Sequence, residues 1–483
     1  MKRKNNYDLL KIIGIAFLLF VVLTWIIPTG SYTSGQFTKG ETTPVGLYGI
    51  FTTPVYSFAV FAQYFILILC IGGFYGVLNK TGVYQQIIEK LTKRFGKKRN
   101  IYLVITILIF SLITSLFSET MMIFILLPFF ITVLLKLDFD KLTAIASTVG
   151  ASLIGMIANI TGNLAIYKNY FGIEPKTTII FNIIMYVVLV FLLSAYIISK
   201  NIIEANNKKE TKENKKETKP EQKEEKLAIP LYVESKNTKK SIVPMIIILT
   251  LTLIVIMLGL YNWYYSFDIN VFNDLYEKIT TIELFGTNII SKIFGQLPII
   301  GSFSNYDVSA ILLISSIAIA WIYSIKTNEF IESFKTGMKK ILLPATYVIL
   351  ASVIFSSVVT ASSGNISITI SNFILNLSNN FNVLTGTLTA MIGSFFYNDY
   401  LYLINGLYSA LSLYDTNMMP VILFIFQSMF GIMMFILPVS ITIIGILKYL
   451  EVSYKDWIKY IWKLLIQIFA ISIIGSIILS MLV

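Results

Sequence analysis

Histidine is absent from this 483-residue chain, and Cys70 is its single cysteine. Without histidine, the chain lacks the usual proton carrier near neutral pH and the commonest transition-metal ligand. A lone cysteine inside an apolar run forms no internal disulfide and no thiolate metal cluster. We therefore expect no cofactor and no resident metal, and any proton relay must use aspartate or glutamate.

Charge is also scarce, because only 13% of the residues are charged, whereas 56% are hydrophobic and the mean hydropathy is +0.76. Apolar runs recur that would cross a hydrocarbon layer of about 30 Å as helices. The alternating segments typical of a transmembrane barrel are not found. The sequence thus predicts an all-α polytopic protein of the cell membrane, in contact with the lipid bilayer. The expected spans are 10–28, 56–79, 177–199, 241–260, 306–325, 418–447 and 460–483.

The first of these spans follows a basic start and resembles the apolar core of a secretory signal. It ends in Trp25 and Pro28, however, with no small-residue cleavage pattern. We therefore expect it to remain in the protein as the first helix.

The net charge of +12 gathers in two segments. Residues 80–100 carry seven Lys or Arg against one Glu, and residues 200–240 carry twelve Lys against eight Glu. The positive-inside rule places both segments on the cytoplasmic side, where they would contact lipid headgroups rather than nucleic acid. Because residues 206–226 contain almost no apolar side chain, we interpret 200–240 as a disordered linker.

The linker separates two halves, 1–199 and 241–483, which repeat one order of features. Each has two helices around an outer loop, a basic amphipathic segment, an interrupted apolar pair, a polar-broken helix and closing helices. This duplication predicts two structural repeats, inverted relative to each other, with re-entrant hairpins and discontinuous helices. Inversion needs an odd number of crossings per half, whereas the count is even. Residues 277–302 would supply another crossing, but the basic segment 326–340 would then face outward.

A polar stretch, "TASSGNISITISNF" at 360–373, interrupts an apolar run in the second half. The arm after it offers about 13 mostly apolar residues, or roughly 20 Å as helix, which is too short to cross. We predict a re-entrant hairpin, because irregular backbone at that depth needs a polar cavity around it. The alternative is a surface loop that joins a full span to an interfacial helix. The predicted tip comprises Ser362, Ser363, Gly364 and Asn365.

The first half has a counterpart in "ITSLFSETMMIFILLP". Ser118 can cap a new helix, and Glu119 and Thr120 follow in its first turn, near the positive end of the helix dipole. A carboxylate deep in lipid costs about 2.5 to 3.5 kcal/mol on insertion scales and so needs a functional reason. The alternative is two complete helices, 101–117 and 119–136, joined by a capped turn at the outer surface.

Polar residues also break the helix that follows each predicted hairpin. The freed carbonyls, with Asn, Ser and Thr oxygens, can coordinate a small hard cation such as a transported Na⁺. For the first break the alternative is a helix end at the outer face. In the second, Asp399 is the strongest single candidate, because apolar sequence extends for more than a helical turn on both sides. The residues are Asn159, Thr161, Gly162 and Asn163 in the first break and Asn398 and Asp399 in the second.

Several blocks resemble the C4-dicarboxylate anaerobic carrier group, which includes basic amino acid antiporters and belongs to the ion-transporter superfamily. They include "LTWIIPTGSY", "ILCIGGFYGVLNKTGVYQQII", "LLPFFITVLLKLDFDKLTAIASTVGASLIG" and "LKYLEVSYKDWIKYIWKLL". The resemblance implies an inverted-repeat fold, two re-entrant hairpins, two unwound helices meeting at a central site, and a homodimer.

Sodium-coupled carriers of that superfamily use Ser-Asn-Thr signatures at the hairpin tips and helix breaks. This chain departs from them, so the coupling stays open between Na⁺, H⁺ and exchange. The comparable triplets here are Ser118-Glu119-Thr120, Asn159-Ile160-Thr161 and Ser363-Gly364-Asn365.

The broken elements contain Glu119 and Asp399 but no basic residue. That composition favours a cationic or zwitterionic solute, so we expect a secondary transporter that exchanges amino acids or couples them to a cation. A C4-dicarboxylate carrier is the alternative, and a channel or a membrane scaffold is a remote one. An enzyme is not expected, since one intramembrane aspartate makes no catalytic dyad.

Overall fold

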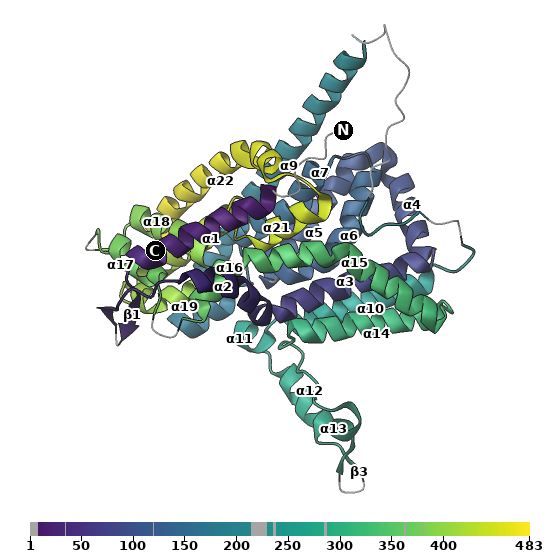
Figure 1. Ribbon diagram of the computed structural model, residues 1–483, viewed down its shortest axis with the longest axis horizontal. Coiled ribbons are helices and arrows are strands. Elements are labelled where there is room, and N and C mark those ends of the chain that lie inside the picture. Colours follow the sequence, from purple (N-terminus) through teal and green to yellow (C-terminus); the bar gives the residue numbers. More distant parts are fainter. Residues whose placement is uncertain are drawn as a thin grey trace.

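The structure is a computed structural model of the chain, shown in Figure 1. It describes residues 8–33, 35–118, 120–213, 229–234, 238–284, 287–361, 364–378 and 380–483.

Within these residues, eight helices are long and apolar enough to cross a membrane. A ninth span results if the bent pair α15 (Thr327–Ala351) and α16 (Val353–Val359), whose axes meet at 45°, is one crossing. This confirms the prediction of a helical, polytopic membrane protein. The eight are α1 (Asp8–Ile26), α3 (Ala62–Lys80), α4 with α5 (Val83–Phe95 and Arg99–Phe117), α9 (Lys176–Glu213), α10 (Val243–Leu260), α14 (Asn305–Ile322), α20 (Met419–Met434) and α22 (Tyr454–Leu482).

Shorter helices complete the first half. Helix α6 (Thr120–Lys136) folds back along α5, and at the base of this hairpin the Arg99 guanidinium lies 5.1 Å from the centre of the Phe139 ring. The chain then continues through α7 (Lys141–Ile145), one π-helical turn and α8 (Ala151–Ile157), where the helix stops. Gly155 of α8 packs closely on α5, because a Cβ there would lie 2.0 Å from the Ser111 carbonyl.

The second half has its own hairpin, formed by α18 (Val383–Phe396) and α19 (Tyr400–Leu411). Its base is closed by the rings of Phe381 and Tyr414, whose centroids are 5.5 Å apart. Helix α20, buried along almost its whole length, stops at Met434, and α21 (Ile441–Leu450) resumes after six residues. Pro438 lies in this gap and cannot donate a backbone hydrogen bond. The interrupted helix of the second half is therefore α20 with α21.

This arrangement corrects two expectations. Asn398 and Asp399 lie in the turn of the α18–α19 hairpin and not in a broken spanning helix. Gly364 and Asn365 join α16 to α17 (Ile366–Leu375) beside a β-hairpin, so they do not form the hairpin turn that meets the interrupted helices. Polar residues mark both places in the sequence. The contact between the Phe381 and Tyr414 rings shows that the chain reverses at Asn398 and Asp399.

This β-hairpin consists of β1 (Gly30–Thr33) and β2 (Gln36–Lys39), paired from Gly30↔Lys39 to Thr33↔Gln36. Gly30 and Asn365 exchange two backbone hydrogen bonds of 3.1 Å, and the Tyr32 hydroxyl donates to Asn372 Oδ1 at 2.7 Å. Burial raises the pKa of Tyr32 to about 12, so this hydroxyl stays a neutral donor at physiological pH. The hairpin thus fastens the N-terminal part of the chain to α17.

Two long helices, α3 and α15, cross in close contact. A Cβ on Gly337 would lie 2.0 Å from the Gly72 carbonyl, and one on Gly76 would lie 2.1 Å from the Ser333 carbonyl. Small residues let the backbones of membrane helices approach closely. The resulting van der Waals contacts stabilise the pair in lipid, where the hydrophobic effect does not drive helices together. In Figure 1, α10 and α14 lie beside this pair.

An arm leaves the body after α10. It contains α11 (Trp263–Phe267), α12 (Val271–Thr280), a two-stranded ribbon (Glu283–Leu284 with Thr287–Asn288) and α13 (Ile289–Phe294), and it projects from the helical body in Figure 1.

The expected linker, 200–240, is helical at its start, because α9 continues to Glu213. Near its end, residues 229–234 pack on the body. Leu231 is buried, and its carbonyl accepts a hydrogen bond of 2.8 Å from Asn79 Nδ2 at the end of α3. This part of the linker is therefore a strap rather than a free tether.

Candidate functional site

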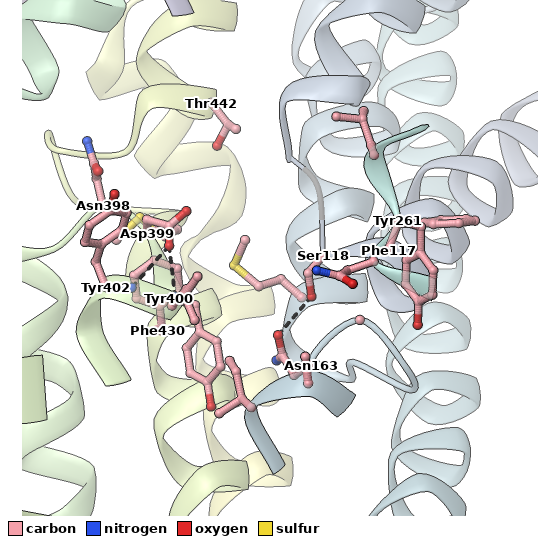
Figure 2. Close-up of a pocket in the computed structure, with 18 of the residues that line it drawn as sticks. Phe117, Ser118, Asn163, Tyr261, Asn398, Asp399, Tyr400, Tyr402, Phe430 and Thr442 are labelled. Carbon is pink, nitrogen blue, oxygen red and sulfur yellow. Dashed lines mark hydrogen bonds between the residues drawn. The ribbon is translucent and has the colours of Figure 1, made fainter. Parts of the chain in front are cut away.

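A cavity of about 480 Å³ lies where the turns of both hairpins meet the breaks of both interrupted helices. Figure 2 shows Ser118 and Asn163 on one side and Asp399 on the other. The polar lining residues are Tyr64, Ser118, Asn163, Tyr261, Asn262, Ser266, Ser302, Asn398, Asp399, Tyr400, Tyr402, Ser440 and Thr442.

The first hairpin turns at Ser118, which adopts a left-handed conformation with φ 57°. This turn is tied to the break after α8 by side chains. Asn159 Nδ2 donates to Ser118 Oγ at 2.6 Å, and Ser118 Oγ donates to Asn163 Oδ1 at 2.9 Å. Gly162 must be glycine here, because a Cβ would lie 2.3 Å from Ser118 Oγ. The turn and the break therefore form one polar unit.

Backbone groups released by the break find partners on α5. The Ser115 carbonyl accepts hydrogen bonds from the amides of Ile160 at 2.9 Å and Thr161 at 3.2 Å. Ser115 Oγ donates to the Ala158 carbonyl at 2.6 Å. These bonds allow a helix to stop inside the protein, where unpaired backbone groups would be costly.

Asp399 begins α19 and caps it. Its Oδ1 accepts from the amides of Leu401 at 2.9 Å and Tyr402 at 3.3 Å, at the positive end of the helix dipole. Asn398 Nδ2 donates to Ser352 Oγ at 3.0 Å, at the bend between α15 and α16. The second turn is thus held by a cap on one side and by the bent span on the other.

The break between α20 and α21 contributes Ser440 and Thr442, whose hydroxyl oxygens lie 3.3 Å apart. Ser440 is the residue before the first turn of α21, and its side chain does not cap that turn. The first backbone N–H groups of a helix have no partner within it, so this end of α21 offers donors toward the cavity.

The cavity is polar but nearly uncharged. Among its lining residues in the described part of the chain, Asp399 is the single carboxylic acid and there is no Lys or Arg. Across the described residues, no group of three or more Cys, Asp or Glu side chains is placed to hold a metal ion. Among the described lining residues, a cation would therefore find hydroxyl, amide and carbonyl oxygens and the carboxylate of Asp399.

The predicted site residues divide into four groups. Ser118, Gly162, Asn163, Asn398 and Asp399 line the cavity.

Asn159 and Thr161 lie one layer behind it, where Thr161 Oγ1 donates to the Leu116 carbonyl at 2.9 Å. Gly364 and Asn365 are not among the lining residues, although Asn365 Nδ2 reaches the Tyr397 hydroxyl at 3.3 Å. Glu119, Ser362 and Ser363 lie outside the described residues, and Thr120 opens α6.

Sequence reasoning missed Gln427, Ser440 and Thr442, because 418–447 was interpreted as a single uninterrupted span. One signal was present: Pro438, followed two residues later by Ser440, is a helix-stop and helix-start pattern inside that apolar run. Gln427 is a polar side chain in the same run, but the sequence does not show its partners Ile157 and Asn163, which come from the other half of the chain.

Two hairpin turns and two helix breaks around a polar interior cavity define a polytopic membrane protein with a solute-sized site. The C4-dicarboxylate anaerobic carrier family, DcuC, matches residues 7–481, so the chain belongs to this family of secondary transporters and is not an enzyme. A solved structure, the Alcanivorax borkumensis YdaH transporter, aligns with 98% of this chain and 98% of its own chain at 13% identity and a TM-score of 0.38. No curated protein matches the sequence.

Proposed function

We propose that the protein carries C4-dicarboxylates through this cavity by alternating access, together with cations. The family match over residues 7–481 is the observation that supports this solute class most strongly. It reverses the preference drawn from the sequence, which placed amino acids first because the broken elements are acidic.

Charge balance is the reason for proposing cations. A dicarboxylate beside Asp399 would put three negative charges in a cavity whose described lining has no basic side chain. Two like charges 5 Å apart repel by about 3 kcal/mol at an effective dielectric constant of about 20. Co-bound Na⁺ or protonation would remove this repulsion, and the oxygens of Ser118, Asn163 and Asp399 are suitable cation ligands.

One carboxylate of the solute would bind at the start of α21. Its first backbone N–H groups, which the Ser440 side chain does not cap, give this end of the helix a positive potential at the cavity wall beside Ser440 and Thr442. Carboxylates of transported solutes bind at such half-helix ends in other carriers.

We also infer an inverted repeat, with boundaries that differ from the predicted halves. Each unit runs as a span, a short connecting helix, a hairpin, an interrupted helix and a closing helix. The first unit is α3 to α9, with α4 as the connecting helix, and the second is α15 to α22, with α17 in that place. Because a hairpin returns to its own side, each unit would cross three times, and an odd count inverts the second unit. The earlier even count of the first half included α1, which lies outside the first unit.

An amino acid carrier is the second candidate, and one observation favours it. Asp399 is the single charge among the described lining residues, and an α-ammonium group would pair with it without any co-transported cation.

The test is counterflow in proteoliposomes preloaded with succinate, fumarate, arginine, ornithine or a neutral amino acid. Each batch is measured with and without Na⁺ and at two pH values. Saturable accumulation driven by dicarboxylates, and dependent on Na⁺ or on low pH, is the expected result. Accumulation driven by amino acids alone would replace the proposal with the second candidate, and unsaturable flux would indicate a channel.

A further inference from the structure

We infer that Gln427 of α20 is a positioning residue for this site: it fixes the direction of the hydrogen bonds that hold Ser118 and Asn163 at the cavity rim. The expected change in KM rests on the proposed function, whereas the expected change in how firmly the Ser118 turn is held does not. Gln427 is fully buried and does not line the cavity itself.

Gln427 joins the two halves of the chain at the first helix break. Its Nε2 donates to the carbonyl of Ile157, the last residue of α8, at 2.9 Å. Its Oε1 accepts from Asn163 Nδ2 at 3.0 Å. Close packing keeps it there, because a Cβ on Gly431, one turn further along α20, would lie 2.4 Å from the Ile157 side chain.

The Ile157 carbonyl determines which group donates and which accepts in each hydrogen bond of this network. A carbonyl can only accept, so the amide nitrogen of Gln427 must face it and the amide oxygen must face Asn163. Asn163 then turns its own nitrogen to Gln427 and its Oδ1 to Ser118. Ser118 therefore donates its single hydroxyl proton to Asn163, at 2.9 Å.

This direction determines what the rim offers to a ligand. With its proton committed to Asn163, Ser118 Oγ has only lone pairs left, and one of them accepts from Asn159 Nδ2 at 2.6 Å. If Asn163 instead donated to Ser118, the hydroxyl proton of Ser118 would be free to point into the cavity, where it would repel a cation. Gln427 thus makes this rim a set of acceptors suited to a cation, although its side chain never touches that cation.

Outer-layer partners of this kind typically change metal affinity by about 10- to 100-fold when they are removed. We therefore expect Gln427→Ala to raise the apparent KM for the activating cation in succinate counterflow by at least about tenfold, with little change in maximal rate. Gln427→Glu loses the donor to Ile157 but keeps an acceptor that holds Asn163 in the same direction, so its KM should stay closer to the wild-type value than that of the alanine variant.

The matched control is Ser428→Ala. Ser428 is the next residue of α20, is equally buried, and its Oγ donates only within its own helix, to the Ile425 carbonyl at 3.1 Å. This variant should keep the wild-type KM. The double variant Gln427→Ala with Asn163→Ala should be no worse than Asn163→Ala alone, because residues of one network are not additive.

A structural readout keeps the test independent of transport. In a Cys70→Ser background, Phe117→Cys places a thiol beside the Ser118 turn, and its rate of reaction with a maleimide reports how firmly the turn is held. Gln427→Ala should speed this reaction, and Ser428→Ala should not. If both variants label at the same rate, the positioning role is wrong whatever is transported. Faster labelling of Gln427→Ala, together with no counterflow of any solute by the wild-type protein, would instead contradict the proposed function and leave the positioning role intact.

Discussion

At the scale of single residues, Asp399 combines two roles. It caps α19 through the amides of Leu401 and Tyr402, and it is the single acid among the described residues that line the cavity. Asparagine caps helices about as well as aspartate, so the two roles can be separated by one substitution.

Asp399→Asn should leave folding intact and remove the charge that a co-transported cation neutralises. We expect downhill succinate exchange to persist, while accumulation driven by a Na⁺ or pH gradient falls strongly, because the carboxylate contributes to cation binding. Parallel assays of exchange and of gradient-driven uptake in the same proteoliposomes measure this. Equal loss of both activities, in a variant with wild-type thermal stability, would contradict the separation of roles.

Polarity within apolar sequence predicted part of the site. Ser118, Asn163 and Asp399 stand out because hydrogen-bonding side chains at membrane depth need partners. Gln427 gives the same signal inside the apolar run 418–447, but its role could not be predicted, since its partner Ile157 lies 270 residues earlier in the chain. A local pattern carries no information about such a contact.

At the scale of elements, lengths and end signals predicted helices better than they predicted turns. The apolar run 383–411 is long enough to span, with Asn398 and Asp399 in its middle, and so it was interpreted as one broken helix. A hairpin of two short arms has the same composition. The two differ only in whether the ends meet, and the contact of Phe381 with Tyr414 is tertiary information.

The crossing of α3 and α15 gives a stability prediction. Gly337→Ala places a methyl group 2.0 Å from the Gly72 carbonyl, which neither backbone can avoid. We expect a loss of about 1–3 kcal/mol and a lower apparent Tm, as measured by fluorescence-detected unfolding in detergent.

Gly14→Ala in α1 is the matched control, because nothing lies within 4 Å of a Cβ at that position. Alanine is favoured over glycine in a helix interior by about 1 kcal/mol, so the control should be neutral or slightly stabilising. Equal Tm values for the two variants would show that the close crossing does not contribute to stability.

At the scale of the whole molecule, the chain ties its parts together across long separations in sequence. The N-terminal β-hairpin binds α17 through Gly30 and Tyr32, and the strap 229–234 binds the end of α3 through Asn79. Composition predicted the membrane location and the helical class. That the linker's far end returns to the body was not predicted, although Leu231 lies in an apolar run, LAIPLYV at 227–233, because a local pattern does not show which surface such a run covers.

The most direct test of the central claim asks whether the transported solute occupies the cavity between the two hairpin turns. Thr442→Cys in a Cys70→Ser background puts one thiol at the start of α21, on the cavity wall. Saturating succinate should slow its reaction with a small thiol reagent several-fold, because the bound solute covers it, whereas arginine should leave the rate unchanged. If no solute that drives counterflow protects this thiol, transport does not pass through this cavity.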